Sequence, residues 1–544
     1  MGAKPVKRWT DKCRPRVLRF GAIVMALAMV MGCENTEGSW NPDAAFQVDS
    51  GVTDALFVSP VVDADEPKPD SIGTDKGADA GSSADLLEAG PPDASSDAFP
   101  FVEQWLSTVG GPSAKLSITD ADFDSFGNST ITGCLSGSVN FGSTALAAQA
   151  QSDPFVAVIS STGKVVQAFS FKSSGHSCGH AIVRNATGDF FVAGSYRKDL
   201  ATTSAKALTA PTTNKDYVFL AKVDSQGTVE WFSSDLGLEG QARGLALDGN
   251  GDIYVTGKFA GQGKIGNRSF SSADKGDLFV AKFSSNGVAT FSLAIHGAGN
   301  SDQGRAINVD SNSNIYITGS VKGPAIHAGA PIVPTGNTHF LVAKFDAQGN
   351  ALWFRHTEGS QGAGQGNALG LTATGDVIVG GSYSGTTLWG TTTLNPSSTG
   401  LGQILISRLS GATGNVLWTT SAESSQGLAA SADAVSIKSD GTFCVAGSFM
   451  GSALESGALT IPGASAQNAR TSFALGFDSG GNASWNLSAW GTSALAGPAF
   501  TAIDCSRGKE LLVAGTMILE NQFGGSRTTT RGVWDMFLWS LLRP

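Results

Sequence analysis

An all-β fold, a seven-bladed β-propeller with four strands per blade, is predicted by three features of this sequence. The chain has 70 glycines and only 15% charged residues among 544, a composition typical of turn-rich β proteins. A short apolar segment behind a turn occurs seven times along the chain, and each interval holds four strand-like segments. Such a period of 61 to 68 residues in a β-rich chain indicates a propeller or solenoid.

The repeat is marked by a glycine that ends a "(T/A)G" pair in most copies, as in "GNGDIYVTGKF". These landmark glycines are Gly133, Gly194, Gly257, Gly319, Gly381, Gly447 and Gly515. A second apolar segment such as "DLFVAKF" follows each of them, with its middle about 24 to 28 residues after the glycine. A turn of the type "DAQGNALW" then leads to an aromatic residue in most repeats. We number the repeats one to seven by their landmark glycine.

Repeat three shows the four strands of one unit. "RGLALD" alternates small and apolar residues, whereas "DIYVTGKF" and "DLFVAKF" are nearly continuous apolar runs, as in strands buried on both faces. The last repeat has three strands, ending with "MFLWSLL", and an unmatched strand, "VEQWLSTVG", opens the domain. We therefore expect the ring to be closed by an N-terminal outer strand, which removes the exposed edges of an open array.

The four-strand unit, the "GN" turns, "YVTG" and "FVAK" resemble the β-propeller repeat of exported bacterial proteins known as the SBBP repeat. The resemblance covers residues from about 100 to 544 and is best in repeats three and four. It implies a seven-bladed propeller. Because the family shares an architecture rather than a reaction, it implies little about function.

The first 32 residues have the pattern of an export signal, with seven Lys or Arg followed by the apolar stretch "FGAIVMALAMVMG". "VMGC" resembles the lipobox of bacterial lipoproteins, so Cys33 is expected to carry the lipid, including palmitate. An ordinary secretory signal is the alternative. Glu34 is not the Asp that retains many such proteins at the inner membrane. The family habit therefore points to an outer-membrane lipoprotein, on its periplasmic or cell-surface side.

Residues 33–98 are expected to form a disordered tether. The stretch from Glu34 to Asp97 has fifteen acidic residues against Lys68 and Lys76, with many Ala, Ser, Gly and Pro. Residues 99–544 form the predicted propeller, whose formal charge of about −3 argues against nucleic-acid binding. We expect a monomer that meets the membrane only through its lipid.

The segment "GHSCGH" could hold a metal ion, because His176, Cys178 and His180 share one face of an extended strand. Disulfides are the alternative that we favour, since exported proteins oxidise their cysteines. Four cysteines remain in the predicted propeller. Two of them lie in the adjacent blades one and two, and the other two lie in the adjacent blades six and seven. The expected pairs are Cys134 with Cys178 and Cys444 with Cys505, with no metal and no cofactor.

Three turns, including "DGNGD" at residues 248–252, have oxygens spaced as at the start of a calcium loop. Each lies between two predicted strands and has no following Glu, so a tight hairpin turn is the interpretation that we favour.

One position varies among the repeats. It lies five residues before the end of the first strand, which is innermost in a propeller, so its side chains are expected to circle one mouth of the central channel. The residues are Thr119, His180, Arg243, Arg305, Asn367 and Asp433, with an apolar residue in repeat seven. His180, Arg243 and Arg305 would form a cationic sector for an anionic group. Solvated or locally paired side chains are the alternative.

The long connections between second and third strands are expected on the same face as these ring residues, where they could recognise a partner. The alternative is that they only extend the edges of the blades. No catalytic triad or phosphate loop is indicated, and "DSQGTVEW" departs from the Asp box of sialidases by one residue of spacing. The sequence thus favours a binding or scaffold propeller for an unknown protein or glycan over a polysaccharide hydrolase or lyase, or a passive spacer.

Overall fold

The computed structural model describes most of the chain from Phe101 onward. The described residues are 101–202, 206–273, 276–298, 302–333, 338–359, 363–396, 402–425, 427–456, 459–464, 469–492, 497–523, 526–531 and 533–543. The signal, Cys33 and the acidic tether lie outside them. Within them the regular structure is strands, and no helix there is long and apolar enough to cross a membrane.

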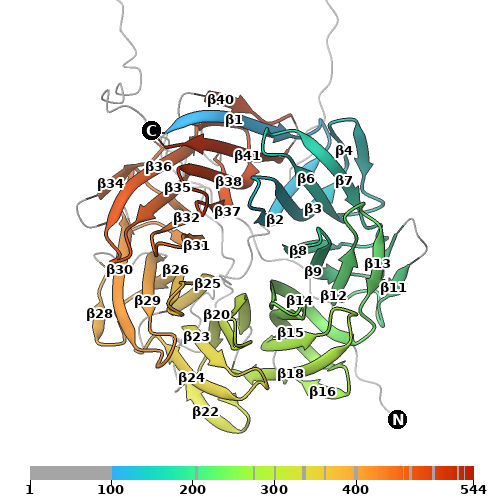
Figure 1. The fold of residues 1–544 in the computed structure, drawn as a ribbon, viewed down its shortest axis with the longest axis horizontal. Helices are drawn as coiled ribbons and strands as arrows, with labels where there is room; N and C mark the ends of the chain where they lie inside the picture. The colour runs from blue at the N-terminus through green and yellow to red at the C-terminus, as the bar shows by residue number, and fades with distance from the viewer. Residues whose placement is uncertain are drawn as a thin grey trace, which may run out of the picture. The chain divides into compact units, whose positions relative to one another are not determined.

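Figure 1 shows sheets arranged around a common centre, so the prediction of an all-β propeller is confirmed. The innermost strands are β2 (Lys115–Phe123), β8 (Cys178–Arg184), β14 (Leu236–Leu247), β19 (Gln303–Val309), β25 (Ala363–Leu371), β31 (Ala430–Ile437) and β37 (Ala499–Asp504). Each contacts the next, and β37 contacts β2.

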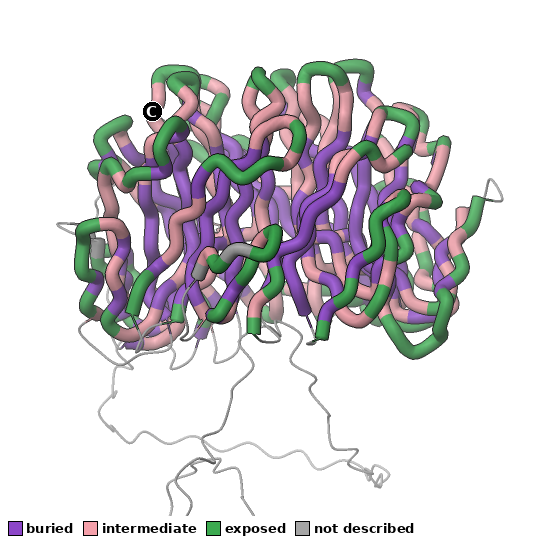
Figure 2. Tube along the Cα trace, turned by 90° about the horizontal axis from the view of Figure 1, so that it is seen from below, coloured by how far each residue is buried: buried purple, intermediate pink, exposed green. Residues whose placement is uncertain are grey.

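The second strands carry the landmark glycines. They are β3 (Ser129–Ser136), β9 (Phe190–Tyr196), β15 (Ile253–Ile265), β20 (Ile315–Lys322), β26 (Val377–Ser384), β32 (Phe443–Met450) and β38 (Glu510–Met517). The third strands are β6 (Asp153–Ile159), β12 (Tyr217–Val223), β17 (Asp277–Phe283), β23 (Thr338–Phe345), β29 (Gln403–Leu409), β35 (Arg470–Phe477) and β41 (Asp535–Leu542). Both sets are almost wholly buried (Figure 2), as their apolar runs predict.

The outer strands are β7 (Val165–Ser170), β13 (Val229–Phe232), β18 (Ala289–His296), β24 (Ala351–His356), β30 (Val416–Ser424), β36 (Ala483–Gly491) and β1 (Val102–Val109). β1 pairs antiparallel with β41, so an early strand completes the sheet that holds β37, β38 and β41. In Figure 1 the two lie side by side, in blue and red.

The sheets do not map one to one onto the repeats. Among the described residues there are six sheets of four or more strands, because repeats two and three share one eleven-stranded sheet. A single residue pair, Tyr217 opposite Glu239, connects β12 to β14 and joins the two units. The remaining repeats each occupy a sheet with the order inner, second, third, outer strand.

The long connections between second and third strands fold into β-hairpins. Their strands are β4 (Ser138–Phe141) with β5 (Thr144–Ala147), β10 (Asp199–Ala201) with β11 (Ala207–Thr209), the end of β15 with β16 (Arg268–Ser271), β21 (Ala325–His327) with β22 (Ala330–Val333), β27 (Thr387–Trp389) with β28 (Thr392–Leu394), β33 (Ala453–Ser456) with β34 (Leu459–Pro462), and β39 (Glu520–Phe523) with β40 (Ser526–Thr529). β21, β33 and β39 also pair with the outer strand of the preceding repeat. These three connections therefore join neighbouring repeats by strand pairing.

Each landmark glycine is required by a close backbone approach. A Cβ on Gly257 would lie 2.0 Å from the carbonyl oxygen of Gln241 on the inner strand, and the other six landmark glycines meet an inner-strand carbonyl at 1.8 to 2.0 Å. In repeats one, three and four the threonine before the glycine donates its hydroxyl hydrogen to a third-strand carbonyl, as Thr256 does to Phe279 at 2.8 Å. In the "TG" pair, the glycine therefore allows the inner strand to approach, and the threonine hydrogen-bonds to the third strand.

Substitution of Gly257 by Ala should lower the free energy of unfolding by roughly 2 to 4 kcal/mol, because the methyl group must displace main-chain atoms. Gly249→Ala is the matched control, since nothing lies within 4 Å of a Cβ at that turn position. Urea unfolding of the two variants makes the comparison. Equal losses would show that the inner strand can move away at no cost.

Two disulfides join adjacent repeats. Cys134 is bonded to Cys178 and Cys444 to Cys505, with Cα atoms 4.7 and 6.3 Å apart, both within the usual range. These are the partners that the sequence suggested. Sequence separations of 44 and 61 residues correspond, in the chain-entropy model, to about 4 kcal/mol of stabilisation each.

Replacing Cys444 and Cys505 together by Ala should therefore lower the free energy of unfolding by about 4 kcal/mol or less. The measurement is urea unfolding under non-reducing conditions. Adding a reductant should destabilise the wild type by more than this variant, because the variant retains only one disulfide. An unchanged wild type in reductant would contradict the stabilising role.

Candidate functional site: the ring of bulge residues around the channel

Every innermost strand has a β-bulge at the same place, and the bulge leaves one residue unpaired with the second strand. A bulge bends the strand locally and re-aims the side chain of its extra residue. The unpaired residues are Thr119, His180, Arg243, Arg305, Asn367, Asp433 and Thr501. Six of them are the positions that the sequence predicted for the channel mouth. We call this set the channel ring.

The member from repeat seven corrects the sequence prediction. Counting back from Asp504 leads to an apolar residue, but the register shift lies between Phe500 and Ala502, which places Thr501 in the ring. The two threonines of the channel ring hydrogen-bond to backbone carbonyls. The hydroxyl of Thr119 donates to the carbonyl of Gly179 in the next repeat at 2.7 Å, and that of Thr501 donates to Ala514 at 3.3 Å.

His180 is not part of a cationic sector, contrary to the sequence prediction. Its Nε2 atom lies 3.0 Å from the hydroxyl oxygen of Ser195. Burial, followed by the nearby positive charges of Arg243, His176 and Lys258, lowers the pKa of His180 to about 3. The imidazole is therefore neutral at physiological pH and can act only as a hydrogen-bonding group.

Arg243 and Arg305 occupy equivalent places on adjacent inner strands. A Cβ on Gly244 would lie 3.0 Å from the carbonyl oxygen of Arg305, so the two backbones approach closely. Arg243 Nη2 donates to Gln241 at 2.8 Å. With its amide turned to satisfy both groups, Gln365 accepts from all three guanidinium nitrogens of Arg305 at 2.9 to 3.2 Å. Burial and the charge of Arg243 lower the pKa of Arg305 to about 9.

The opposite charge in the ring is Asp433. Its carboxylate accepts from Ser431 at 2.6 Å and from Asn367 at 3.0 Å. Burial raises the pKa of Asp433, and the positive charges of Arg305 and Arg470 oppose this rise. Asp433 in turn opposes the fall in the pKa of Arg305. The charges of Arg243, Arg305 and Asp433 thus act on one another, so the structure brings these predicted residues together.

Two groups near the ring escaped the sequence prediction. Lys258 follows the landmark glycine of repeat three, at a position where the other repeats have Cys, Ser or Thr, and this exception was the available signal. Asp120 follows Thr119 and accepts from the backbone nitrogens of Ala121 and Ile182. Burial raises the pKa of Asp120 to about 7. No sequence pattern distinguished this residue from a surface carboxylate.

The metal interpretation of "GHSCGH" loses one of its ligands, because the sulfur of Cys178 is in a disulfide. Throughout the part of the chain that the structure describes, no three His, Cys, Asp or Glu residues lie close enough to hold a metal ion.

The calcium-like segments are hairpin turns. In the turn of repeat three, Asp248 Oδ1 accepts from the backbone nitrogens of Asn250 and Asp252 at 2.9 and 3.0 Å, while Oδ2 accepts from Tyr254. Asp310 and Asp124 accept in the same way within their own turns. Since N–H groups cannot coordinate a cation, these contacts favour the turn interpretation.

The comparisons agree with the propeller architecture. A family model described as a beta-propeller repeat (SBBP) matches residues 292–322, which include the second part of the outer strand β18 and the first two strands of repeat four. The chain is a β-propeller protein. A search of curated proteins found no match.

Solved structures similar to this β-propeller protein share little sequence with it. A protein of unknown function from Dyadobacter fermentans is 11% identical, with 67% of this chain and 94% of that chain covered and a TM-score of 0.35. The Neurospora crassa Pan2 WD40 domain is 11% identical, with coverages of 81% and 95% and a TM-score of 0.40. A europium-containing methanol dehydrogenase is 8% identical, with coverages of 82% and 94% and a TM-score of 0.35. We take no functional argument from them.

His180→Gln should reduce the acid sensitivity of folding. The folded-state pKa of His180 is about 3 and the ordinary value is 6.5. Between these two pH values, His180 binds a proton in the unfolded chain but not in the folded chain. Stability contributed by the neutral imidazole is therefore lost as the pH falls from 6.5 toward 3, by roughly 1.4 kcal/mol per pH unit. From pH 7 to pH 5 the wild type should lose roughly 2 kcal/mol more than the variant in urea unfolding. Equal losses would contradict a buried, neutral His180.

Proposed function

We propose that this protein is a non-enzymatic binding or scaffold propeller whose channel ring recognises an anionic group on a protein or glycan partner. The observation that carries the proposal is the juxtaposition of Arg243 and Arg305 on adjacent inner strands. Arg243 donates to the neutral side chain of Gln241, and Arg305 donates to the neutral side chain of Gln365. Two guanidinium groups held this way retain charge for a bound anion.

The binding proposal is favoured over a polysaccharide hydrolase or lyase by the state of the carboxylates around the channel. Such hydrolysis commonly needs two free carboxyl groups on either side of the scissile bond. Asp433 is held by Ser431 and Asn367, and Asp120 and Asp122 accept from backbone nitrogens of the neighbouring repeat. A passive spacer remains the other alternative, and the ring variants below separate it from a binder.

The proposed ring has seven blades and is closed by β1. Dividing the eleven-stranded sheet at its single connecting pair gives seven groups, each with an inner, a second, a third and an outer strand, and three of these groups also hold hairpin strands. Among the described residues, six hydrophobic clusters combine side chains of two consecutive repeats, and one combines the first repeat with the last. One cluster packs Leu116 and Phe155 of repeat one against Met536 and Leu538 of repeat seven. These contacts support closure between the first and last repeats.

The proposed location is outside the cytoplasm, with the protein attached to the outer membrane as a monomeric lipoprotein through Cys33. The basic and apolar segments before Cys33 support export. The two disulfides support an oxidising compartment. The acidic stretch after Cys33 would separate the propeller from the membrane surface.

Arg243→Gln and Arg305→Gln test the binding proposal by crosslinking of the full-length protein on intact cells, followed by mass spectrometry. Each variant should reduce capture of a reproducible partner about tenfold, because a charge-assisted contact contributes about 1.5–3 kcal/mol. The melting temperature should change little, since glutamine keeps a polar group in the channel. Lys206→Gln, an exposed cation beside β11 on the hairpin of repeat two, is the matched control.

Capture that is unchanged in both arginine variants would overturn the role of the ring and favour the spacer. Turnover of a polysaccharide by the wild type would overturn the non-enzymatic proposal.

A further inference from the structure

A second candidate site arises where the ring closes, on the face opposite the hairpins. Elsewhere, the glycine of each turn between third and outer strands packs on an aromatic residue of the preceding repeat. A Cβ on this glycine would lie 2.6–3.0 Å from a ring atom, and its φ is between 69° and 87°. The described contacts are Gly163 on Trp105, Gly227 on Phe169, Gly287 on Trp231, Gly349 on Phe291, Gly414 on Trp353 and Gly481 on Trp418.

Trp485, the aromatic residue of repeat six, has a different neighbour. The outer strand that completes the next sheet is β1, which pairs with β41 and does not follow it through a turn. No turn glycine therefore covers Trp485. Phe101, which precedes β1, packs against it instead, with ring centroids 5.0 Å apart and an interplanar angle of 78°. Closure by β1 thus interrupts the pattern of aromatic–glycine contacts at this one junction.

A pocket of about 300 Å³ lies at this junction. It is lined by Phe101, Trp485, Cys505, Leu511, Lys438, Glu510, the 508–509 turn and Arg543. The volume is at the lower end of the range for small-ligand sites, about 300–1,000 Å³. A pocket of this size suits one ring-sized ligand rather than an extended polymer. The apolar wall formed by Phe101, Trp485 and Leu511 suits the face of such a ring.

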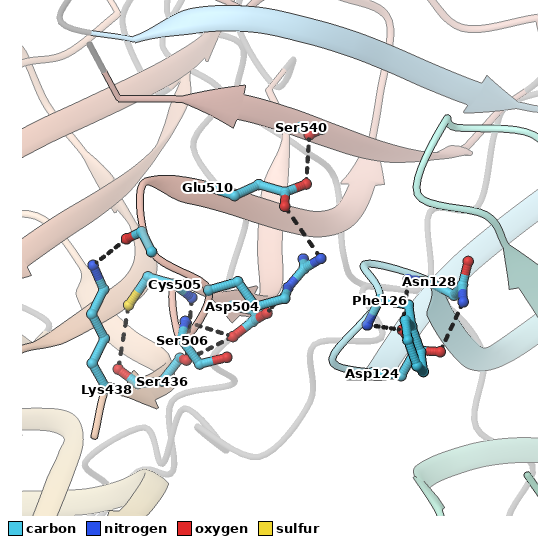
Figure 3. Close-up of polar contacts among 12 residues, drawn as sticks. Asp124, Phe126, Asn128, Ser436, Lys438, Asp504, Cys505, Ser506, Glu510 and Ser540 are labelled. Carbon is cyan, nitrogen blue, oxygen red and sulfur yellow. Dashed lines mark hydrogen bonds and ion pairs between the residues drawn. The ribbon is translucent and has the colours of Figure 1, made fainter. Parts of the chain in front are cut away.

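The polar lining of the pocket is predominantly cationic. Lys438 Nζ donates to the carbonyl of Gly508 at 2.7 Å, which holds its ammonium group beside the turn (Figure 3). Glu510, the acidic group of the lining, is ion-paired with Arg507 at 3.3 Å and accepts from Ser540 at 3.4 Å. Lys509 and Arg543 are exposed. Three cations therefore surround a pocket whose carboxylate is already compensated.

The wall that bears these cations is rigid. Cys505 is bonded to Cys444, and its backbone nitrogen donates to the hydroxyl of Ser436 at 3.2 Å. Asp504 holds Arg507 at 3.0 Å and accepts from the backbone nitrogen of Ser506 at 2.9 Å. Figure 3 shows this network from Ser436 to Ser540. These contacts constrain the backbone next to the cations before any ligand arrives, which lowers the entropic cost of binding.

We propose that the pocket between Trp485, Lys438, Lys509 and Arg543 binds an acidic monosaccharide, with the sugar ring against the apolar wall and its carboxylate among the cations. Lys and Arg supply hydrogen-bond donors to the carboxylate. Glu510 and the main-chain groups of the 508–509 turn supply acceptors and donors for sugar hydroxyls. The site is independent of the channel ring and does not require the function proposed for it.

The test is isothermal titration of the full-length protein with glucuronate and galacturonate, beside glucose and acetate as the uncharged and ring-free probes. The expected result is binding of at least one uronate, with glucose and acetate each at least tenfold weaker. Lys509→Gln and Arg543→Gln should each weaken uronate binding about tenfold. Lys164→Gln, an exposed cation in the turn between β6 and β7 of repeat one, should change nothing. Arg243→Gln should also leave this binding unchanged.

Binding of acetate as tight as that of the uronates would overturn the sugar assignment, and equal binding of glucose would overturn the role of the cations. Absence of binding by every probe would overturn the site. If a variant loses binding together with its melting transition, the quenching of tryptophan fluorescence by uronate in the wild type, compared with Trp485→Phe, decides the outcome. Quenching that persists in Trp485→Phe would place the ligand elsewhere.

Discussion

The close approach of an inner-strand carbonyl to the landmark glycine is the constraint on which the rest of the ring depends. Wherever the inner strand bulges, its carbonyl takes the space that a side chain on the second strand would need. Only glycine therefore fits on the second strand opposite the bulge, which explains why "(T/A)G" marks the repeat. The same bulge leaves one residue per repeat unpaired with the second strand. A framework requirement and a position of variable sequence thus arise from one local irregularity.

Packing between units depends on contacts that cross repeat boundaries. Hydrophobic clusters combine consecutive repeats, hairpins pair with the preceding outer strand, and turn glycines pack on the preceding aromatic residue. A single unit would leave one face of its sheet exposed, so its stability comes from its neighbours. From the sequence, the long connections between second and third strands could be either recognition loops or extensions of the blade edges. In the structure they include strands that contribute to this packing.

Much of the fold could be predicted from the sequence, because strand burial and turn chemistry leave periodic patterns. The landmark glycines, the four strands and six of the ring positions followed from spacing alone. The ring member of repeat seven did not, because a fixed count cannot detect where a bulge shifts the register to Thr501. Nor did the neutral state of His180, which depends on burial and on Arg243 and Lys258 in the neighbouring repeat. Charge states depend on three-dimensional neighbours that no local pattern records.

The two candidate sites lie at different levels of the inner strands. The bulge residues lie within the inner strands, whereas Lys438 and Lys509 lie at the turns that follow inner strands. Different irregularities produce them: the ring comes from a bulge repeated in every unit, and the pocket comes from the one junction where β1 replaces a turn. Because their residues do not overlap, ligands at the two sites would not compete for the same side chains. Under the two proposals, one propeller therefore offers two separate sites.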